Sequence, residues 1–75
     1  MPQHDPILVV FGRNVRRFRG AKDLTQEKLA ERADLDSTYI SGIERGVRNP
    51  GIKNVARIAK ALGISTSELC VGVEA

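Results

Sequence analysis

The stretch from Leu24 to Gly46 reads LTQEKLAERADLDSTYISGIERG and decides the fold, because it predicts two short helices joined by a tight turn. Thr25 can accept hydrogen bonds from the free N–H groups at the start of the first helix. Leu29, Ala30 and Ala33 then fall on one helical face, and charged residues fill the opposite face. We therefore expect a short amphipathic helix that opens at Thr25.

Residues 34–36 form the turn that leads into the second helix. Asp34 tolerates left-handed backbone angles at modest cost, and Leu35 is the apolar turn residue that we expect to be buried. Ile40 and Ile43 lie three apart in the second helix and point inward. The outer surface near its start carries small or hydrogen-bonding residues that suit base edges: Ser37, Thr38, Tyr39, Ser41 and Gly42. This arrangement predicts a helix-turn-helix unit, which places its second helix in the major groove of DNA.

The same residues carry a family resemblance. The pattern L-T-Q-x-x-L-A, then a turn, then I-S-x-I-E-x-G is matched by residues 24–30 and 40–46. The stretch resembles the phage-repressor type of helix-turn-helix transcriptional regulator, the XRE-like family related to Cro. The string from Thr38 to Arg45, with Arg48-Asn49-Pro50, is most similar to the controller proteins of restriction–modification systems. The resemblance covers roughly Phe11 to Gly72 and implies an all-α, five-helix, lambda-repressor-like DNA-binding domain.

The flanking sequence predicts three more helices around the same core. Apolar side chains recur at spacings of three and four over residues 8–18, and the same period returns over residues 52–62. Ser65 and Glu68 form a capping box for a short helix that ends near residue 71. We therefore expect a flexible N-terminal arm, residues 1–6, followed by a single domain for DNA binding and dimerisation, residues 7–75.

Composition argues against several classes of function. The chain has 75 residues and a formal net charge of +3, with no apolar run of membrane-spanning length. Its one cysteine, Cys70, has no partner for an internal disulfide and no neighbours spaced as zinc ligands. One histidine and one isolated thiol do not supply a nucleophile with a base. We therefore expect a cytoplasmic, non-enzymatic protein without metal, cofactor or membrane contact.

Positive charge gathers on both sides of an acidic stretch. Residues 23–44 include six acidic and two basic residues, whereas all charged residues of the range 45–60 are basic. A charged run on a helix is most often a solvated face, and this reading suits Arg13, Arg17 and Arg57. The cluster of Arg45, Arg48 and Lys53 directly follows the second helix of the motif, so we expect it to contact DNA phosphates.

The resemblance implies further DNA contacts. Base edges or nearby phosphates are expected to meet the outer residues of the second helix, namely Ser37, Thr38, Tyr39 and Ser41. Phosphates are expected to meet the residues that surround it, namely Gln26, Arg48, Asn49 and Lys53. Controller proteins often carry arginine at the position of Ser37, where it grips guanine with two hydrogen bonds. Serine is short and pairs with several bases, so the preferred DNA sequence cannot be carried over.

Three individual residues need separate consideration. Tyr39 neighbours Ile40 and is either a core aromatic or a DNA contact, and its helical spacing favours the DNA contact. Arg19 and Glu44 match family positions that pair across the first and third helices. The resemblance therefore implies that they form a largely buried ion pair.

A single recognition helix with short side chains reads only a few base pairs, too few to stand out against a genome. We therefore expect a symmetric homodimer on a pseudo-palindromic operator in double-stranded DNA. The C-terminal segment is more apolar than so small a core needs, which predicts a dimer surface from Ile64, Leu69, Cys70, Val71 and Val73. We expect no small-molecule effector. The alternative is an antitoxin or another protein-interaction member of the same fold.

Overall fold

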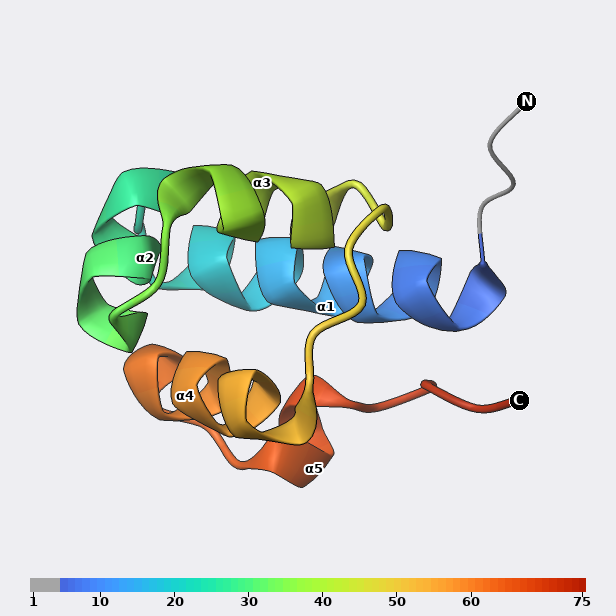
Figure 1. Cartoon of the computed structure of the whole chain (residues 1–75). Helices are drawn as coiled ribbons and strands as arrows, with labels where there is room; N and C mark the ends of the chain where they lie inside the picture. The colour runs from blue at the N-terminus through green and yellow to red at the C-terminus, as the bar shows by residue number, and fades with distance from the viewer. Residues whose placement is uncertain (1–4) are drawn as a thin grey trace.

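Five helices make up residues 5–75, the part of the chain that the structure, a computed structural model, describes (Figure 1). They are α1 (Pro6–Ala21), α2 (Gln26–Ala33), α3 (Ser37–Glu44), α4 (Ile52–Leu62) and α5 (Thr66–Leu69). No strand occurs between residues 5 and 75, so the predicted all-α fold with five helices is confirmed. None of these five helices is long and apolar enough to cross a membrane.

α1 begins one residue earlier than the sequence predicts. The Asp5 carboxylate accepts a hydrogen bond from the N–H of Ile7 at 2.9 Å and so caps the helix. Pro6 occupies the first helical position, where its fixed φ is already suitable and its missing N–H costs nothing. The expected arm over residues 1–6 therefore loses its last residue to α1. Residues 1–4 lie outside the described residues.

All five helices contribute to one core. α1 packs against α3, α2 lies between α3 and α4, and α5 closes the bundle against α1 and α4 (Figure 1). The fully buried side chains of the core are Val15, Leu29, Ile40, Ile43, Ile58, Leu62 and Leu69. Burying one such side chain stabilises a fold by about 1.5–3 kcal/mol. Because two of the seven come from α3, the helix that we expect to meet DNA is firmly attached to the rest of the molecule.

The helix ends follow local signals in the sequence. Asp23 and Asp34 have φ values of 56° and 58°, so both aspartates adopt the left-handed conformation. At the start of α5, the Ser65 hydroxyl accepts from the N–H of Glu68 at 3.0 Å. The Glu68 carboxylate in turn accepts from the N–H of Ser65 at 3.1 Å, which confirms the predicted capping box. α5 is shorter than predicted, since it ends at residue 69.

Gly12 allows α1 and α3 to approach closely. A Cβ atom at this position would lie 2.3 Å from the carbonyl oxygen of Ile43 and 2.8 Å from that of Glu44. Both atoms belong to the backbone at the C-terminal end of α3, so a larger residue would force the two helices apart. The sequence predicts only a slightly weakened helix at Gly12, because its partners lie far away along the chain.

Among residues 5–75, Asn14 is the one buried polar residue, and it connects α1 to the end of α5. Its side-chain amide donates to the carbonyl of Leu69 at 2.9 Å and to that of Val71 at 2.8 Å. Carbonyl groups at a helix C-terminus have no partner within the helix, so Asn14 satisfies groups that would otherwise be costly to bury.

Candidate nucleic-acid interface

The turn between α2 and α3 fixes the direction of α3. Asp34 ends α2 in the left-handed conformation, and the N–H of Leu35 donates back to the carbonyl of Ala30 at 2.8 Å. Leu35 is half-buried and packs against the core, so its predicted burial is partial. Asp36 then caps α3, because its carboxylate accepts from the N–H of Thr38 at 2.7 Å. The helix-turn-helix predicted from the sequence is therefore present.

α3 presents short polar side chains on its outer side. Ile40 and Ile43 are fully buried, so the opposite face of the helix is directed away from the core. Of the predicted base-contact residues, Thr38 is exposed, whereas Ser37, Tyr39 and Ser41 are half-buried. All four lie on this one helix.

Tyr39 combines features of both readings that the sequence left open. Its ring is partly buried and packs against the core, as expected of a core aromatic. Its hydroxyl accepts a hydrogen bond from the amide of Asn54 at 3.2 Å, which links α3 to the first turn of α4. The hydroxyl proton of Tyr39 remains available for donation to a ligand.

An ion pair joins the C-terminal ends of α1 and α3 beside this face. Arg19 donates from Nε to Glu44 at 2.6 Å, from Nη2 to Glu44 at 3.0 Å and from Nη1 to the Leu24 carbonyl at 2.7 Å. The side chains of Arg19 and Glu44 are 17% and 4% exposed, so the largely buried pair implied by the resemblance is confirmed. These hydrogen bonds to Glu44 raise the pKa of Arg19 above its ordinary value.

Gln26 belongs to the same network. Its side-chain amide donates to the second oxygen of the Glu44 carboxylate at 3.1 Å. Gln26 is the first residue of α2, so the network orients the side chain that the family resemblance implies will hold a phosphate. The sequence alone does not reveal this link, because residues 26 and 44 lie in different helices.

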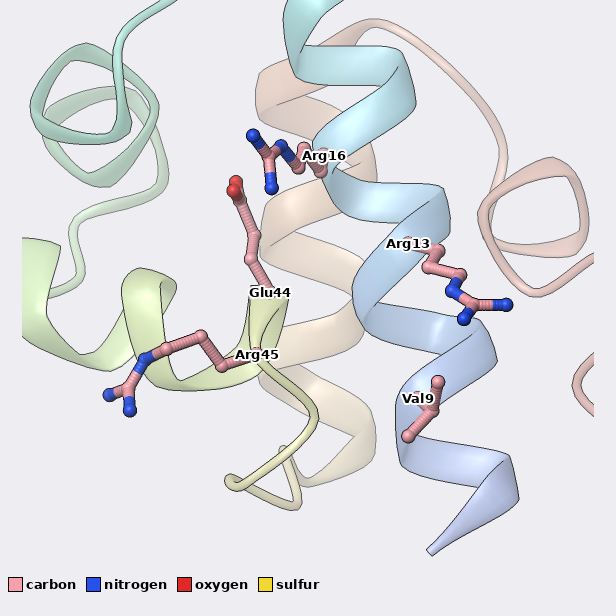
Figure 2. Close-up of a pocket in the computed structure, with 5 residues that line it drawn as sticks. All are labelled: Val9, Arg13, Arg16, Glu44 and Arg45. Atoms are coloured by element: carbon pink, nitrogen blue, oxygen red, sulfur yellow. The ribbon is translucent and has the colours of Figure 1, made fainter. Parts of the chain in front are cut away.

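Positive charge surrounds the C-terminal end of α3. An open hollow of about 500 Å³ lies here, lined by Val9, Arg13, Arg16, Glu44 and Arg45. Figure 2 shows the side chain of Arg45 extending to one side of the hollow and that of Arg13 to the other. Within residues 5–75 the ion pairs are Arg19–Glu44 and Lys28–Glu31, so none of the three lining arginines forms an ion pair with a described carboxylate.

The loop after α3 and the start of α4 place three further predicted residues at the surface. Arg48, Asn49 and Lys53 are all exposed. No side chain of the described residues caps α4, which leaves the first N–H groups of the helix, near Lys53, open to an anion. Gly42, in contrast, is buried beneath the side chain of Arg48 and is not an open surface for base edges.

The predicted dimer surface needs correction. Leu69 is fully buried in the core, so its assignment to a subunit contact is wrong and only its predicted core role holds. Ile64, Cys70 and Val73 are half-buried and pack partly on the same core, whereas Val71 is 54% exposed. Cys70 is a free thiol.

Two exposed apolar residues lie outside the predicted dimer set. Ile52 is 77% exposed and Val47 is 50% exposed. Ile52 shares the helical period of the buried residues of α4, but it is the first residue of the helix and the structure leaves it largely exposed. A small apolar groove of about 110 Å³ opens on the molecule, and its lining consists of Ile7, Leu8, Phe11, Asn49, Pro50, Val55, Cys70 and Val73.

The chain is similar to proteins of known class. A family model described as helix-turn-helix matches residues 15–69. The chain is 48% identical over 64 residues to control protein C.BamHI of Bacillus amyloliquefaciens, covering 84% of this chain and 79% of that protein. It is 44% identical over 69 residues to control protein C.MunI of a Mycoplasma species, covering 91% and 93%. The crystal structure of restriction-modification controller protein C.AhdI from Aeromonas hydrophila aligns with a TM-score of 0.81 at 47% identity, covering 83% and 94%.

The chain therefore belongs to the helix-turn-helix family, and it is a DNA-binding transcriptional regulator. This family consists of transcriptional regulators and not of enzymes. The relatives named above are controller proteins, in agreement with the resemblance carried by the residues around α3.

Proposed function

We propose that this chain is a controller protein of a restriction–modification system, which binds a pseudo-palindromic operator as a homodimer and regulates transcription there. The main support for this proposal is the chemistry of the surface around α3. The exposed, hydrogen-bonding side of α3 is bordered by arginine and lysine side chains that form no ion pair with carboxylates of residues 5–75. Such a surface suits the major groove, where base edges need donors and acceptors and the flanking phosphates need positive charge.

The contacts divide into two kinds. Thr38 and Ser41, together with Ser37 and the hydroxyl of Tyr39, face base edges or the phosphates beside them. The residues around α3 hold the DNA backbone, namely Gln26, Arg45, Asn49 and Lys53. Backbone contacts set the position of the protein on the duplex, whereas base contacts choose the sequence.

Gln26 supports this division, because its side chain is held by a buried ion pair. A prepositioned amide loses less side-chain entropy when it binds a phosphate. The Arg19–Glu44 pair therefore acts on DNA binding through Gln26, by holding α1, α2 and α3 in one arrangement. Neither member of the pair needs to contact a base.

Dimerisation would double the number of base pairs that the protein reads. A two-fold dimer places two recognition helices about one helical turn of DNA apart, which explains why an operator would be pseudo-palindromic. Apolar surface for the contact is available at Ile52 and Val71, which are both more than half exposed. We assign the contact to these residues and to the half-buried Ile64, Cys70 and Val73. The apolar groove runs beside this set, since Cys70 and Val73 line it.

Selection of binding sites from random double-stranded DNA tests the proposal. The expected result is one enriched sequence with approximate two-fold symmetry, whose half-sites are centred about one helical turn apart. Footprinting on that sequence should show protection of both half-sites. Recovery of DNA without any enriched sequence, or protection of a single half-site, contradicts the proposal. The Thr38→Ala variant provides a matched comparison, since it should shift the enriched sequence without abolishing the fold.

A further inference from the structure

α3 ends in a turn that folds the following loop back along the helix. The N–H of Gly46 donates to the carbonyl of Ile43, and the N–H of Val47 donates to the carbonyl of Gly42, both at 3.0 Å. This pair of bonds is the Schellman arrangement, which requires a left-handed residue just past the helix. Gly46 supplies that residue with a φ of 76°. As a result, the chain returns Arg48 to the surface of α3.

The side chain of Arg48 lies across Gly42. A Cβ atom at Gly42 would be 2.5 Å from Cγ of Arg48, 3.4 Å from Nε and 3.5 Å from Cδ. Gly42 is buried by this cover, even though it belongs to α3. Only glycine leaves the space that the aliphatic part of Arg48 occupies. The missing side chain at position 42 therefore makes room for Arg48.

The guanidinium of Arg48 is free to bind a ligand from this position. Neither ion pair within residues 5–75 includes Arg48, so its N–H donors are not committed to a described carboxylate. Gly42 follows Thr38 by four residues, and residues four apart are neighbours on a helix surface. Arg48 therefore lies beside the residues that we assign to base contacts. Its packing against Gly42 limits the freedom of its side chain.

We propose that Arg48 reads a guanine in the major groove and that Gly42 provides the surface that aims it. This rests on the proposed function, because α3 must lie in the groove. Paired N–H donors of a guanidinium match the N7 and O6 acceptors of guanine. Ser37 is too short for this contact, so Arg48 supplies the forked donor that the start of α3 lacks. Arg48 therefore moves from the phosphate-contact set, where the sequence placed it, to the base-contact set.

Modified operator DNA tests the assignment. In the selected operator, each guanine of a half-site is replaced in turn by 7-deazaguanine, which lacks the N7 acceptor. Binding is then titrated for the wild-type chain, for Arg48→Lys and for Gly42→Ala. At one guanine, the change should weaken wild-type binding by roughly fivefold or more, because it removes one of the two hydrogen bonds of the bidentate contact. At that position the two variants should lose about twofold or less, since they no longer make the contact.

The two variants separate charge from geometry. Arg48→Lys keeps the positive charge but lacks the planar fork, so a phosphate role would survive the change and a guanine role would not. Gly42→Ala keeps Arg48 itself, and alanine favours the helix more than glycine does. Its Cβ atom displaces the Arg48 side chain, so discrimination at the guanine should fall while the melting temperature stays the same or rises. Lys53→Ala serves as the contrasting control and should weaken all DNA sequences alike.

Each other outcome overturns the inference in a distinct way. Equal losses to 7-deazaguanine in wild type and in Arg48→Lys would show that another residue reads the guanine. Unchanged sequence preference in Arg48→Lys would return Arg48 to the phosphate contacts. If no guanine of the half-site responds in the wild type, Arg48 does not bind N7. Failure of the wild-type chain to prefer any DNA sequence would instead contradict the proposed function itself.

Discussion

Thr38 and Lys53 represent the two kinds of contact in the proposed complex at the scale of single residues. Both are exposed, and they lie at the starts of α3 and α4 respectively. The threonine hydroxyl is short and can both donate and accept, so it can choose among base edges that come close. The lysine ammonium is a point charge on a flexible stem, so it suits phosphates and is insensitive to sequence.

Substituting these two residues should therefore give different results. Lys53→Ala should weaken binding to all sequences alike and lower the slope of log affinity against log salt by about one. Thr38→Ala should instead change the preference among single-base operator variants by roughly 1–3 kcal/mol at one or two base pairs. Titrations at several salt concentrations measure both quantities. Arg57→Ala, on a face that we assign to solvent, is the control. An unchanged preference in Thr38→Ala would falsify the base-contact assignment.

At the scale of the elements, the close contact between α1 and α3 depends on Gly12. Gly12→Ala should improve helix propensity by about 1 kcal/mol. The new Cβ atom would meet backbone oxygens at 2.3 Å and 2.8 Å, which cannot move aside as a side chain can. Overpacking of this kind costs about 1–3 kcal/mol or more, so we expect a net loss of stability.

Gly20 offers a matched control within the same helix. A Cβ atom at Gly20 meets no described atom within 4 Å, so Gly20→Ala should raise stability by up to about 1 kcal/mol. Chemical denaturation of both variants decides the matter. Equal stabilisation by the two alanines would mean that α1 and α3 do not require glycine at their contact.

The Arg19–Glu44 pair also acts between elements, because it joins α1 to the end of α3. Glu44→Gln or Arg19→Met alone should cost about 3 kcal/mol, since each leaves the other charge buried without its partner. The double variant should lose less free energy of unfolding than the sum of the two single losses. Thermal melts of the three variants measure this coupling, and additive losses would argue against a functional pair. The hydrogen bonds to Glu44 raise the pKa of Arg19 above its ordinary value, so the arginine keeps its charge throughout the neutral pH range.

The elements were predictable where their signals are local. The capping box of Ser65 and Glu68 and the left-handed Asp34 are written in neighbouring residues, and each appears in the structure. The role of Gly12 was not predictable, because it depends on atoms of α3 more than one helix away. The same reason hides the hydrogen bond from Gln26 to Glu44. The sequence therefore predicts which elements carry the residues proposed to contact DNA, but it does not reveal the contacts that orient their side chains.

At the scale of the whole molecule, the exposure of an apolar residue in a single chain separates residues that can form a subunit contact from residues that form the core. Helical periodicity places Ile52 on the buried stripe of α4, and the apolar content of the C-terminal segment places Leu69 among the dimer residues, but the structure supports neither assignment. Periodicity gives the direction of a side chain around its helix and does not say where along the helix the core begins or ends. The structure leaves Ile52 largely exposed and Leu69 fully buried.

Ile52 therefore provides the sharpest test of the proposed homodimer. A two-fold interface contains each residue twice, so Ile52→Ser should remove about 3 kcal/mol or more from the dimer contact. This loss corresponds to roughly a hundredfold increase in the dimer dissociation constant. The fold of each subunit should be unaffected, since the side chain is 77% exposed in a single chain. Ala56→Ser, at another exposed position of α4, is the matched control.

Sedimentation at micromolar concentration distinguishes the outcomes. We expect a dimer for the wild type and for Ala56→Ser, and a shift toward monomer for Ile52→Ser. Because two half-sites are bound by two linked subunits, loss of the dimer contact should also make operator binding weaker and less cooperative. A wild-type chain that stays monomeric both free and on DNA would refute the homodimer. A dimer that Ile52→Ser leaves intact would place the subunit contact elsewhere on the molecule.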